Sequence, residues 1–402
     1  MSYNKTKLLV ISQYFTPDIT AAAYRISETV GGLVESGMDV RVITSTPHKS
    51  NTNNLLNEKE KNVIRIEIPF YKRQTKLTYL YQYLVFTFNS ITKAMYLRRS
   101  FKFDLILVSS PPITIAFVAF IIKFFTKKPL VFDIRDVWPD SAVAIDKISK
   151  NGIIYNFFKK VEKYIYLRAD YLTCVAEPMK DYIQNISKKD NVKVIYNGAS
   201  DELLNLSIKK SKFVYKNNFF YSYAGNFGHA QDIETVIKAF SKFLSENKDQ
   251  NCYLRLIGNG PEKENVISAS KDLFGNERII FQDEVQKTTL QHILLSSHVL
   301  IIPLIQSDVF KLTIPSKVFD YMSFQVPIIS TIDGEGKKIL SSSKANINSN
   351  LNVNDLALSF KDVYENYENY ANFSDQNKII VKKYSRFNSN AEFTKILKEL
   401  NK

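Results

Sequence analysis

Short apolar runs alternate with longer amphipathic stretches along most of this chain. Residues 8–12, 40–44 and 105–109 are rich in branched apolar side chains, a pattern typical of parallel strands buried on both faces. Residues 21–36 place apolar side chains three or four positions apart, which predicts a helix with one buried face. Strands and helices that alternate in this way predict an α/β fold with parallel sheets.

The same alternation begins again in the second half of the chain. Residues 199–216 show little periodicity and many Lys and Ser residues, so we place the link between two domains there. We expect an N-terminal domain over residues 1–200, a second domain over 201–375 and a C-terminal helix within 376–402. In the second half, strands are predicted at 219–224, 253–257, 279–281 and 299–304, and helices at 232–244, 288–295, 354–372 and 384–401.

Residues 312–322 are the most informative stretch of the second half. They lie between two apolar runs and are predicted to form a short helix, with Pro315 near its first turn and Ser316 near its cap. A strand followed by a helix N-terminus presents unpaired backbone N–H groups that bind anions. Asp320 lies one turn into this helix, within reach of ribose hydroxyls beside a bound phosphate. The alternative is a helix cap with a surface carboxylate.

Two glycine-rich turns follow predicted strands of the second half. Gly225 and Gly228 bracket the first turn, and Gly258 begins the second. Glycine lets backbone amides approach an anion closely, so the first turn is a candidate phosphate site. A simple tight turn is the alternative for it, because two glycines alone are a weak signal.

In the first half, the apolar run at 129–132 leads directly into a turn dense in charge. Asp133, Arg135, Asp136 and Asp140 lie at the carboxyl end of this predicted strand, where open α/β sheets bind ligands. Charged groups this crowded are costly without partners or a role. Either the turn belongs to a functional site or Arg135 forms an internal salt bridge with the neighbouring carboxylates. The spacing does not fit a metal site, and no metal is expected.

Composition narrows the class of protein further. The 402 residues are 45% apolar, as expected for a globular protein with real cores. Cys174 and Cys252 have no paired spacing, which favours a reducing compartment. The chain starts with a predicted strand instead of a signal peptide, and its longest apolar run, 115–122, is far short of the ~20 residues of a spanning helix. We therefore expect a cytoplasmic protein.

The net charge of +14 is concentrated in the first half of the chain. Residues 1–200 contain 29 Lys and Arg against 17 Asp and Glu, whereas residues 201–402 contain 25 against 23. No acid occurs between Glu67 and Asp104, and aromatic residues run through this basic stretch, which suits an anionic membrane surface. Nucleic acid would attract the same charge, but no helix-turn-helix, zinc or RNP pattern is present. A solvated helix whose aromatic residues pack inward is the structural alternative. The basic residues of the stretch are Lys72, Arg73, Lys76, Lys93, Arg98, Arg99 and Lys102.

Taken together, these motifs resemble family-4 retaining glycosyltransferases of the GT-B fold, over nearly the whole chain except residues 50–103. The turn 136–143 and the opening residues Tyr14, Phe15, Pro17 and Asp18 with Arg25 are similar to the branch that contains N-acetyl-L-fucosamine transferases. The resemblance implies two Rossmann-like domains that face each other across a cleft, with the C-terminal helix crossing back to the first. The segments that carry the family resemblance are 223–226, 257–261 and 315–322.

The resemblance implies that the second domain binds a nucleotide-diphosphate sugar. Asp320 takes the place of the second acid of the family's E-x7-E pattern, which binds ribose, whereas Leu312 stands where the first acid is expected. Many relatives bind the pyrophosphate with an Arg and a Lys that this chain lacks, so His229, Lys317 or backbone amides would take that role. The implied donor-binding residues are Gly225, Asn226, Phe227, Gly228, His229, Gly258, Val285, Ser316, Lys317 and Asp320.

The resemblance also implies that the first domain binds the acceptor. Arg135 and Asp136 stand where many relatives carry a catalytic His, and together with Lys317 they are the predicted catalytic residues. The implied acceptor-binding residues are Pro17, Asp18, Ala21, Arg25 and Trp138.

The implied reaction is sugar transfer with retention of configuration, by a front-face displacement that needs no metal or other cofactor. UDP is expected as the nucleotide rather than GDP, and the sugar is expected to be an N-acetylated deoxy-amino sugar. The acceptor would be a polyprenyl-diphosphate-linked or other saccharide in bacterial capsule or O-antigen synthesis, at the inner face of the cell membrane. Two alternatives stay open: a GT-B nucleotide-sugar epimerase without an acceptor, and a non-enzymatic polyanion-binding protein.

Overall fold

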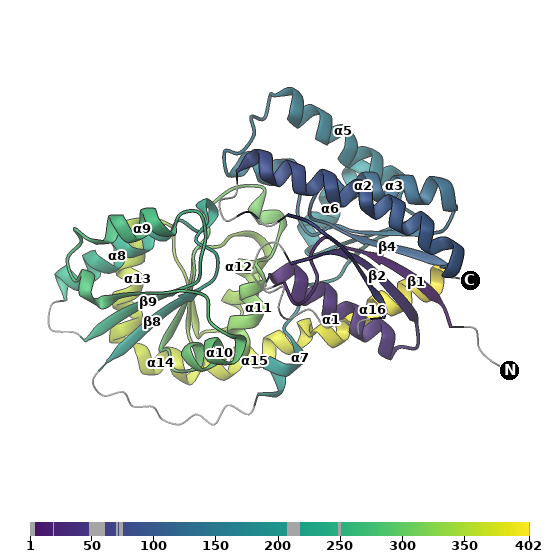
Figure 1. Ribbon diagram of the computed structural model, residues 1–402. Helices are drawn as coiled ribbons and strands as arrows, with labels where there is room; N and C mark the ends of the chain where they lie inside the picture. Colours follow the sequence, from purple (N-terminus) through teal and green to yellow (C-terminus); the bar gives the residue numbers. More distant parts are fainter. Residues whose placement is uncertain are drawn as a thin grey trace. The chain divides into compact units, whose positions relative to one another are not determined.

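The chain folds into two compact units (Figure 1). The computed structural model describes residues 5–18, 20–47, 61–69, 71, 75–206, 218–247 and 251–401. The N-terminal unit comprises Met1–Asn197 together with Arg386–Lys402, and the C-terminal unit comprises Gly198–Ser385. The last helix of the chain is thus part of the N-terminal unit, because the chain returns to that unit after Ser385.

The N-terminal unit is built on a seven-stranded parallel sheet of order β3-β2-β1-β4-β5-β6-β7. In β1, an interior strand, Leu8–Ile11 pair with Val40–Ile43 on one side and with Leu105–Val108 on the other. All four of these central residues are fully buried, which explains the uninterrupted apolar run. The strands are β1 (Lys7–Ile11), β2 (Asp39–Ser45), β3 (Val63–Ile66), β4 (Leu105–Ser109), β5 (Leu130–Asp133), β6 (Tyr171–Cys174) and β7 (Val192–Val194).

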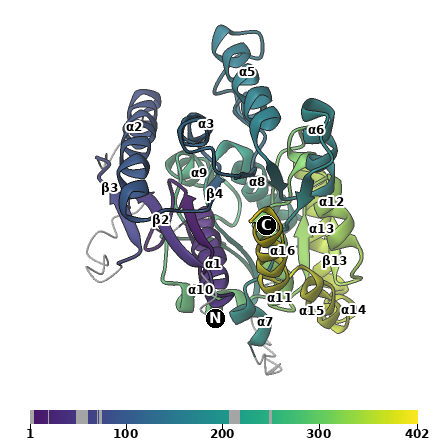
Figure 2. The same ribbon diagram turned by 90° about the vertical axis from the view of Figure 1, so that its right-hand side faces the viewer.

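Helices cover both faces of this sheet (Figures 1 and 2). On one face, Ile26 and Leu33 of α1 pack with Phe393 and Leu397 of α16 over the central strands. On the other face, α2 packs against α3, and α3 against α5. The helices of this unit are α1 (Ala21–Glu35), α2 (Lys76–Ser100), α3 (Ile115–Thr126), α4 (Asp140–Ala144), α5 (Ile153–Arg168), α6 (Glu177–Ser187) and α16 (Arg386–Leu400). No helix in the described ranges is long and apolar enough to cross a membrane.

The C-terminal unit is built on a six-stranded parallel sheet of order β10-β9-β8-β11-β12-β13. Chain order and spatial order reverse between β8 and β11, so the carboxyl ends of these two strands form the topological switch point at which such sheets bind ligands. The strands are β8 (Phe219–Ala224), β9 (Cys252–Ile257), β10 (Ile279–Gln282), β11 (Val299–Ile302), β12 (Ile328–Ser330) and β13 (Asn346–Asn348).

An aromatic core lies between this second sheet and the helices α8 and α13. Tyr221 of β8 packs edge-on against Phe240 and Phe360, and its hydroxyl donates a hydrogen bond to the Phe360 carbonyl. The helices of this unit are α7 (Asp201–Asn205), α8 (Ile233–Glu246), α9 (Lys263–Ser270), α10 (Lys287–Leu295), α11 (Ser316–Ser323), α12 (Gly334–Ser341), α13 (Val353–Glu365), α14 (Tyr367–Asn372) and α15 (Ser374–Val381).

Several elements differ from the sequence prediction. The single acidic helix predicted at 354–372 is two helices, because the chain leaves the helical conformation at Asn366. The elements α12, β13 and α15 were not predicted, since their apolar patterns are too short to be distinctive. At α11, Pro315 occupies the N-cap position and Ser316 is the first helical residue, with no side-chain cap. The predicted link contains α7, and its residues 207–216 lie outside the described part of the chain.

Candidate functional site

The two glycine turns of the C-terminal unit lie against each other at the carboxyl edge of its sheet. The Gly225 amide donates to the Ile257 carbonyl at 2.9 Å, and the Gly258 amide donates to the Gln282 carbonyl at 3.0 Å. A Cβ atom at Gly258, where φ is +132°, would lie 2.0 Å from the Gly225 carbonyl oxygen. The turns therefore touch through their backbones, and glycine is required at residue 258 by contact as well as by conformation.

The Lys317 ammonium lies directly over the first of these turns. A Cβ atom at Gly225 would lie 2.4 Å from Lys317 Nζ, and this nitrogen is 5.3 Å from the centre of the Tyr223 ring. No hydrogen bond or ion pair to Nζ is found in the part of the chain that the structure describes. Burial lowers the pKa of Lys317 to about 8, while the nearby Asp320 carboxylate acts in the opposite direction. The site therefore holds a cation next to a partly exposed glycine turn, which suits a phosphate.

Tyr321 fixes the position of α11 relative to the first turn. Its buried hydroxyl accepts a hydrogen bond from the Ala224 amide at 2.8 Å and donates one to the Ala224 carbonyl at 3.1 Å. Tyr223 supports the same turn, because its hydroxyl donates to the Asn226 carbonyl at 2.6 Å. Sequence reasoning gave neither tyrosine a role, although both lie within the segments 223–226 and 315–322 that carry the family resemblance.

Lys263 is a second lysine of this site that sequence reasoning missed. Its buried ammonium donates to the Gly258 carbonyl at 2.7 Å, to Asp283 Oδ1 at 2.6 Å and to the Gln282 carbonyl at 3.3 Å. It thereby joins the carboxyl ends of β9 and β10. Because its donors are occupied by these partners, Lys263 braces the turns, whereas Lys317 has no such hydrogen-bonded partners among the described residues.

The other residues predicted to bind the nucleotide sugar differ in how available they are to a ligand. His229 Nε2 lies 2.9 Å from Glu262 Oε1, so its side chain already has an anionic partner. The Phe227 side chain is fully buried, and its amide donates to the Asn259 carbonyl, so neither is available to a ligand. Asp320, Ser316 and Val285 are partly exposed; Val285 lies in the loop between β10 and α10.

In the N-terminal unit, the buried carboxylate of Asp133 forms the centre of a cluster. It accepts hydrogen bonds from Ser109 Oγ and Thr173 Oγ1, both at 2.8 Å. Arg25 Nη1 lies 3.6 Å and Arg135 Nη1 4.0 Å from Asp133 Oδ2. Burial lowers the pKa of Arg25, and Asp133 opposes this shift. Arg25 and Arg135 therefore act at least as internal counterions, in agreement with the salt-bridge alternative for Arg135.

Asp136 has no cationic partner in this cluster. Its Oδ1 accepts a hydrogen bond from the Ser141 hydroxyl, and burial raises the pKa of Asp136. Asp140, four residues later, is held instead by Lys159 and Tyr155, each at 2.8 Å. The charged turn thus divides into a paired Asp140 and an unpaired, partly exposed Asp136, which remains the candidate for chemistry.

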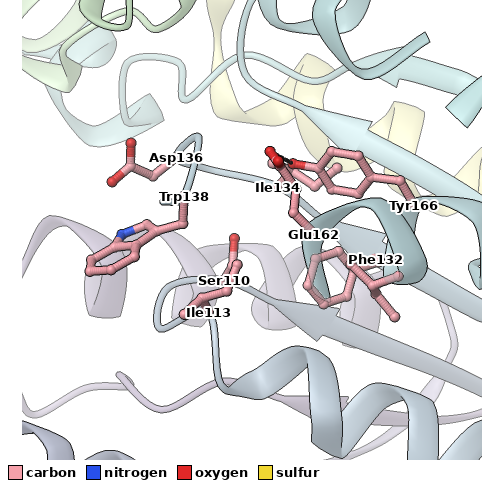
Figure 3. Close-up of a pocket in the computed structure, with 9 residues that line it drawn as sticks. Ser110, Ile113, Phe132, Ile134, Asp136, Trp138, Glu162 and Tyr166 are labelled. Carbon is pink, nitrogen blue, oxygen red and sulfur yellow. Dashed lines mark hydrogen bonds between the residues drawn. The ribbon is translucent and has the colours of Figure 1, made fainter. Parts of the chain in front are cut away.

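A small cavity opens beside Asp136 at the carboxyl ends of β4 and β5. Figure 3 shows Asp136 and Trp138 on one side of it and Glu162 and Tyr166 on the other, with the Ser110 hydroxyl between them. The residues that line it are Ser110, Ile113, Phe132, Ile134, Asp136, Trp138, Glu162, Ile165 and Tyr166.

The remaining first-domain residues lie near the end of β1. Asp18 is buried and its amide donates to the Phe15 carbonyl at 3.1 Å, and Pro17 precedes it in the same loop. Ala21 is the first residue of α1. Of the basic stretch, Lys72 and Arg73 lie outside the described residues. Within those residues, no group of three His, Cys, Asp or Glu side chains could hold a metal ion.

Two family models match this chain, one in each unit. Residues 22–203 match Glycosyltransferase Family 4, and residues 205–379 match Glycosyl transferases group 1. Each half of the chain thus matches a glycosyltransferase family model. The fold of the chain is GT-B, as predicted, with two parallel-sheet Rossmann-like domains.

Solved structures with the same fold match over almost their full length. Sucrose-phosphate synthase from Thermosynechococcus elongatus has a TM-score of 0.73 at 13% identity, covering 98% of this chain and 99% of that one. Anabaena HepE in complex with UDP and glucose has a TM-score of 0.73 at 14% identity, covering 98% and 100%. WaaG, a glycosyltransferase involved in lipopolysaccharide biosynthesis, has a TM-score of 0.71 at 12% identity, covering 97% and 99%.

Curated relatives match over shorter stretches. The uncharacterized glycosyltransferase MJ1069 of Methanocaldococcus jannaschii is 28% identical over 138 residues, which are 33% of this chain and 34% of the relative. The probable glycosyltransferase WbjE of Pseudomonas aeruginosa is 21% identical over 243 residues, 58% of this chain and 59% of the relative. The chain therefore spans about a third to three fifths of the curated relatives it matches.

Proposed function

We propose that this GT-B chain transfers a sugar, with retention of configuration, from a nucleotide-diphosphate donor in its C-terminal unit to a saccharide acceptor in its N-terminal unit. The observation that carries the proposal is the Lys317 ammonium, which lies over the Gly225 turn without a protein anion hydrogen-bonded to it among the described residues. A doubly charged phosphate leaving group would supply that anion.

In this proposal the C-terminal unit stabilises the departing diphosphate. The acceptor hydroxyl oxygen forms a bond to the anomeric carbon, the bond from that carbon to the phosphate oxygen breaks, and the hydroxyl proton passes to the leaving phosphate. Lys317 would face the oxygen on which negative charge develops, and one such preorganised donor is worth ~3 kcal/mol of barrier. Asp320, one turn into α11, would bind the ribose hydroxyls. No step of this sequence uses a metal or other cofactor.

The finer identity of the substrates is part of the proposal. Several structural neighbours were solved with bound UDP, UDP-glucose or UDP-2-fluoro glucose, which supports UDP rather than GDP as the nucleotide here. The resemblance to the N-acetyl-L-fucosamine transferase branch supports an N-acetylated deoxy-amino sugar as the donor. A role in bacterial capsule or O-antigen synthesis is proposed as well, and the fold that this chain shares with WaaG, a glycosyltransferase involved in lipopolysaccharide biosynthesis, is consistent with it.

The proposed acceptor is linked to a lipid, and α2, α3 and α5 offer a surface for a membrane. Arg98, Arg99 and Lys102 are exposed at the end of α2, and Lys127 lies 4.6 Å from the Phe124 ring centre. Basic side chains next to exposed aromatic rings suit anionic lipids, at ~1 kcal/mol per Lys or Arg. We therefore propose peripheral binding to the inner face of the cell membrane. Side chains exposed over more than half of their surface are Leu77, Tyr81, Phe88 and Tyr96 on α2, Phe124 and Phe125 on α3, and Ile153, Ile154 and Phe157 on α5.

The donor site is tested by titrating UDP and uridine into the protein and into Lys317→Met. The variant should lose affinity for UDP by about tenfold or more, because one charge-assisted contact is worth ~1.5–3 kcal/mol. Its affinity for uridine, which has no phosphate, should change little. Lys271→Met, which removes an exposed lysine of the same unit, is the matched control. Equal UDP affinity in Lys317→Met and the control would remove Lys317 from the site.

The membrane surface is tested by flotation with vesicles that contain or lack anionic lipid. The double variant Phe88→Ser and Phe125→Ser should float less with anionic vesicles than the parent protein. Phe387→Ser is the control, because Phe387 is 70% exposed but lies on α16, across the sheet from α2 and α3. Equal binding to both vesicle types would argue against this surface. So would a loss of flotation in Phe387→Ser as large as that in the double variant.

A further inference from the structure

The charged turn at residues 133–140 is fastened to α5 by one lysine. Lys159 Nζ donates hydrogen bonds to Asp140 Oδ2 at 2.8 Å and to Glu162 Oε2 at 2.6 Å, and a third to the Tyr182 hydroxyl. An ammonium has three N–H donors, so all of them are occupied by protein partners. These partners come from α4, α5 and α6, and Lys159 therefore joins three helices at one point.

Lys159 is one cation for two carboxylates. The Tyr182 hydroxyl lies 3.2 Å from Asp140 Oδ2 and 3.0 Å from Glu162 Oε1, so the two carboxylates are close to each other. A phenol has one proton and donates to only one of them at a time. Burial by itself lowers the pKa of Lys159, but the charge of Glu162 and the hydrogen bond to Asp140 raise it overall, so the ammonium keeps its charge. In the described ranges, no other Lys or Arg pairs with either carboxylate.

The two carboxylates differ in how far they can move. The Glu162 side chain is 1% exposed, whereas that of Asp140 is 18% exposed. Without Lys159, two like charges would face each other in a largely buried space, and an uncompensated buried charge is costly. Because Glu162 is enclosed by protein, Asp140 is the group that would turn toward solvent. The charged turn would move with it.

The charged turn depends on this fastening because α4 is short. Asp140 begins α4, which has five residues and no side-chain hydrogen bond at its N-cap. A helix of this length is not stable without tertiary contacts. The next residue, Ser141, donates its hydroxyl to the Asp136 carboxylate. A displacement of Asp140 is therefore passed to Asp136 through the adjoining serine.

We propose that Lys159 is a positioning residue for sugar transfer, which holds Asp136 in place through Asp140 and Ser141. The inference rests on the proposed function, in which Asp136 is the candidate for chemistry in the N-terminal unit. Lys159 acts through its protein partners alone, since none of its donors is left for a substrate. Its loss should lower kcat by about 10–100-fold, because a displacement of about 1 Å can reduce a rate ~100-fold.

Trp138 reports the position of the charged turn directly. It is the only tryptophan of the 402 residues, and it lies between Asp136 and Asp140 with a partly exposed side chain. Figure 3 shows Trp138 and Glu162 on different sides of the small cavity. The emission of Trp138 and its quenching by acrylamide therefore follow a movement of the turn away from α5, and neither measurement needs a substrate.

The experiment compares Lys159→Met with Lys160→Met in the full chain. Both variants remove one positive charge from α5, but Lys160 is exposed and makes no hydrogen bond or ion pair among the described residues. In Lys159→Met the emission of Trp138 should move to longer wavelength and acrylamide should quench it more strongly, whereas Lys160→Met should match the parent protein. Equal spectra in all three proteins would overturn the proposal. Glu162 would then take up a proton instead of repelling Asp140.

A double variant separates charge repulsion from lost packing. Lys159→Met combined with Glu162→Gln removes the second negative charge, so the spectrum and kcat should return toward those of the parent protein. A double variant as altered as Lys159→Met would overturn the charge mechanism. Should Lys159→Met fail to fold by circular dichroism, Asp140→Ala decides the question, because it leaves Lys159 and Glu162 paired one to one. An unchanged Trp138 spectrum in Asp140→Ala would also overturn the proposal.

Kinetics on the same samples separate this inference from the proposed function. UDP release is followed with UDP-N-acetyl-L-fucosamine as the donor probe and a short-prenyl-diphosphate N-acetylglucosamine as the acceptor probe. Lys159→Met should lower kcat without changing UDP affinity, and Lys159→Arg, which keeps the charge, should recover most of kcat. A shifted Trp138 spectrum with normal kcat would overturn the positioning role and leave the donor site standing. A parent protein that binds no UDP would instead contradict the proposed function.

Discussion

The position of Lys317 predicts how donor capture depends on pH. Burial lowers the pKa of this ammonium from 10.5 to about 8, with Asp320 opposing the shift. Because the amine is charged below its pKa and neutral above it, the phosphate site keeps its cation at pH 7 and loses it as the pH rises through about 8. Deprotonation of Lys317 therefore mimics, reversibly, the removal of its charge.

The size of the effect follows from the titration of one group. At one unit above the pKa only about a tenth of the protein carries the ammonium, so kcat/KM for the donor should fall roughly tenfold between pH 7 and pH 9. A bound diphosphate raises the pKa of Lys317, so kcat should fall at higher pH than kcat/KM does. Lys317→Met should be slow at every pH, by about the ~3 kcal/mol of a lost transition-state donor, which is more than a hundredfold.

The assay is the release of UDP from a UDP-sugar in the presence of acceptor, followed from pH 6.5 to 10. Lys317→Arg is the decisive control, because a guanidinium keeps its charge over this range and should flatten the fall in kcat/KM. A wild-type profile that stays flat to pH 10, or a fall that Lys317→Arg reproduces at the same pH, would refute the assignment of the cation to Lys317.

Further predictions concern the turns, the fold and the first domain. Gly258→Ala should lower the thermal midpoint and weaken UDP binding, because its Cβ would clash with the Gly225 carbonyl. In the control Gly37→Ala, where φ is +93° and the space around the residue is open, the free energy of unfolding should fall by only ~1 kcal/mol. Burial lowers the pKa of His298 to about 4, so as the pH falls the unfolded chain takes up a proton at this residue before the folded protein does. The free energy of unfolding should therefore fall by up to ~3 kcal/mol between pH 6.5 and pH 4. In chemical denaturation, His298→Asn should lose this pH dependence. Asp136→Asn should reduce kcat about tenfold or more with an unchanged thermal midpoint, whereas normal turnover would leave Asp136 a purely structural role. EDTA should leave turnover unchanged, which a strict requirement for added divalent metal would contradict.

Local pattern was enough to predict the elements that form the site. The apolar runs that become β8, β9 and β11 are buried on both sides, so their strands are visible as uninterrupted hydrophobic stretches. The glycines at 225 and 258 marked the turns, since only close backbone contact or unusual φ demands glycine there. The proposal that Lys317 binds the donor also began from its place in the motif at 315–322.

Other roles depended on contacts between residues far apart in the chain. The sequence placed His229 and Lys317 as equal candidates for the phosphate cation, and the structure separates them because Glu262 pairs with His229. Arg25 was expected to bind the acceptor, and this stays a prediction. The structure adds that Arg25 is buried beside Asp133, more than a hundred residues away in the chain.

What the sequence determined by itself was periodicity, turn chemistry and the uneven charge, because these depend on neighbours within a few residues. Only the tertiary structure decided which charged groups are neutralised within the protein and which remain available to a ligand. Lys263 and Lys317 look alike in the sequence, but one is surrounded by carbonyls and a carboxylate and the other faces a glycine turn. That difference is set by long-range packing, which brings each lysine either to a partner or to an open edge of the sheet.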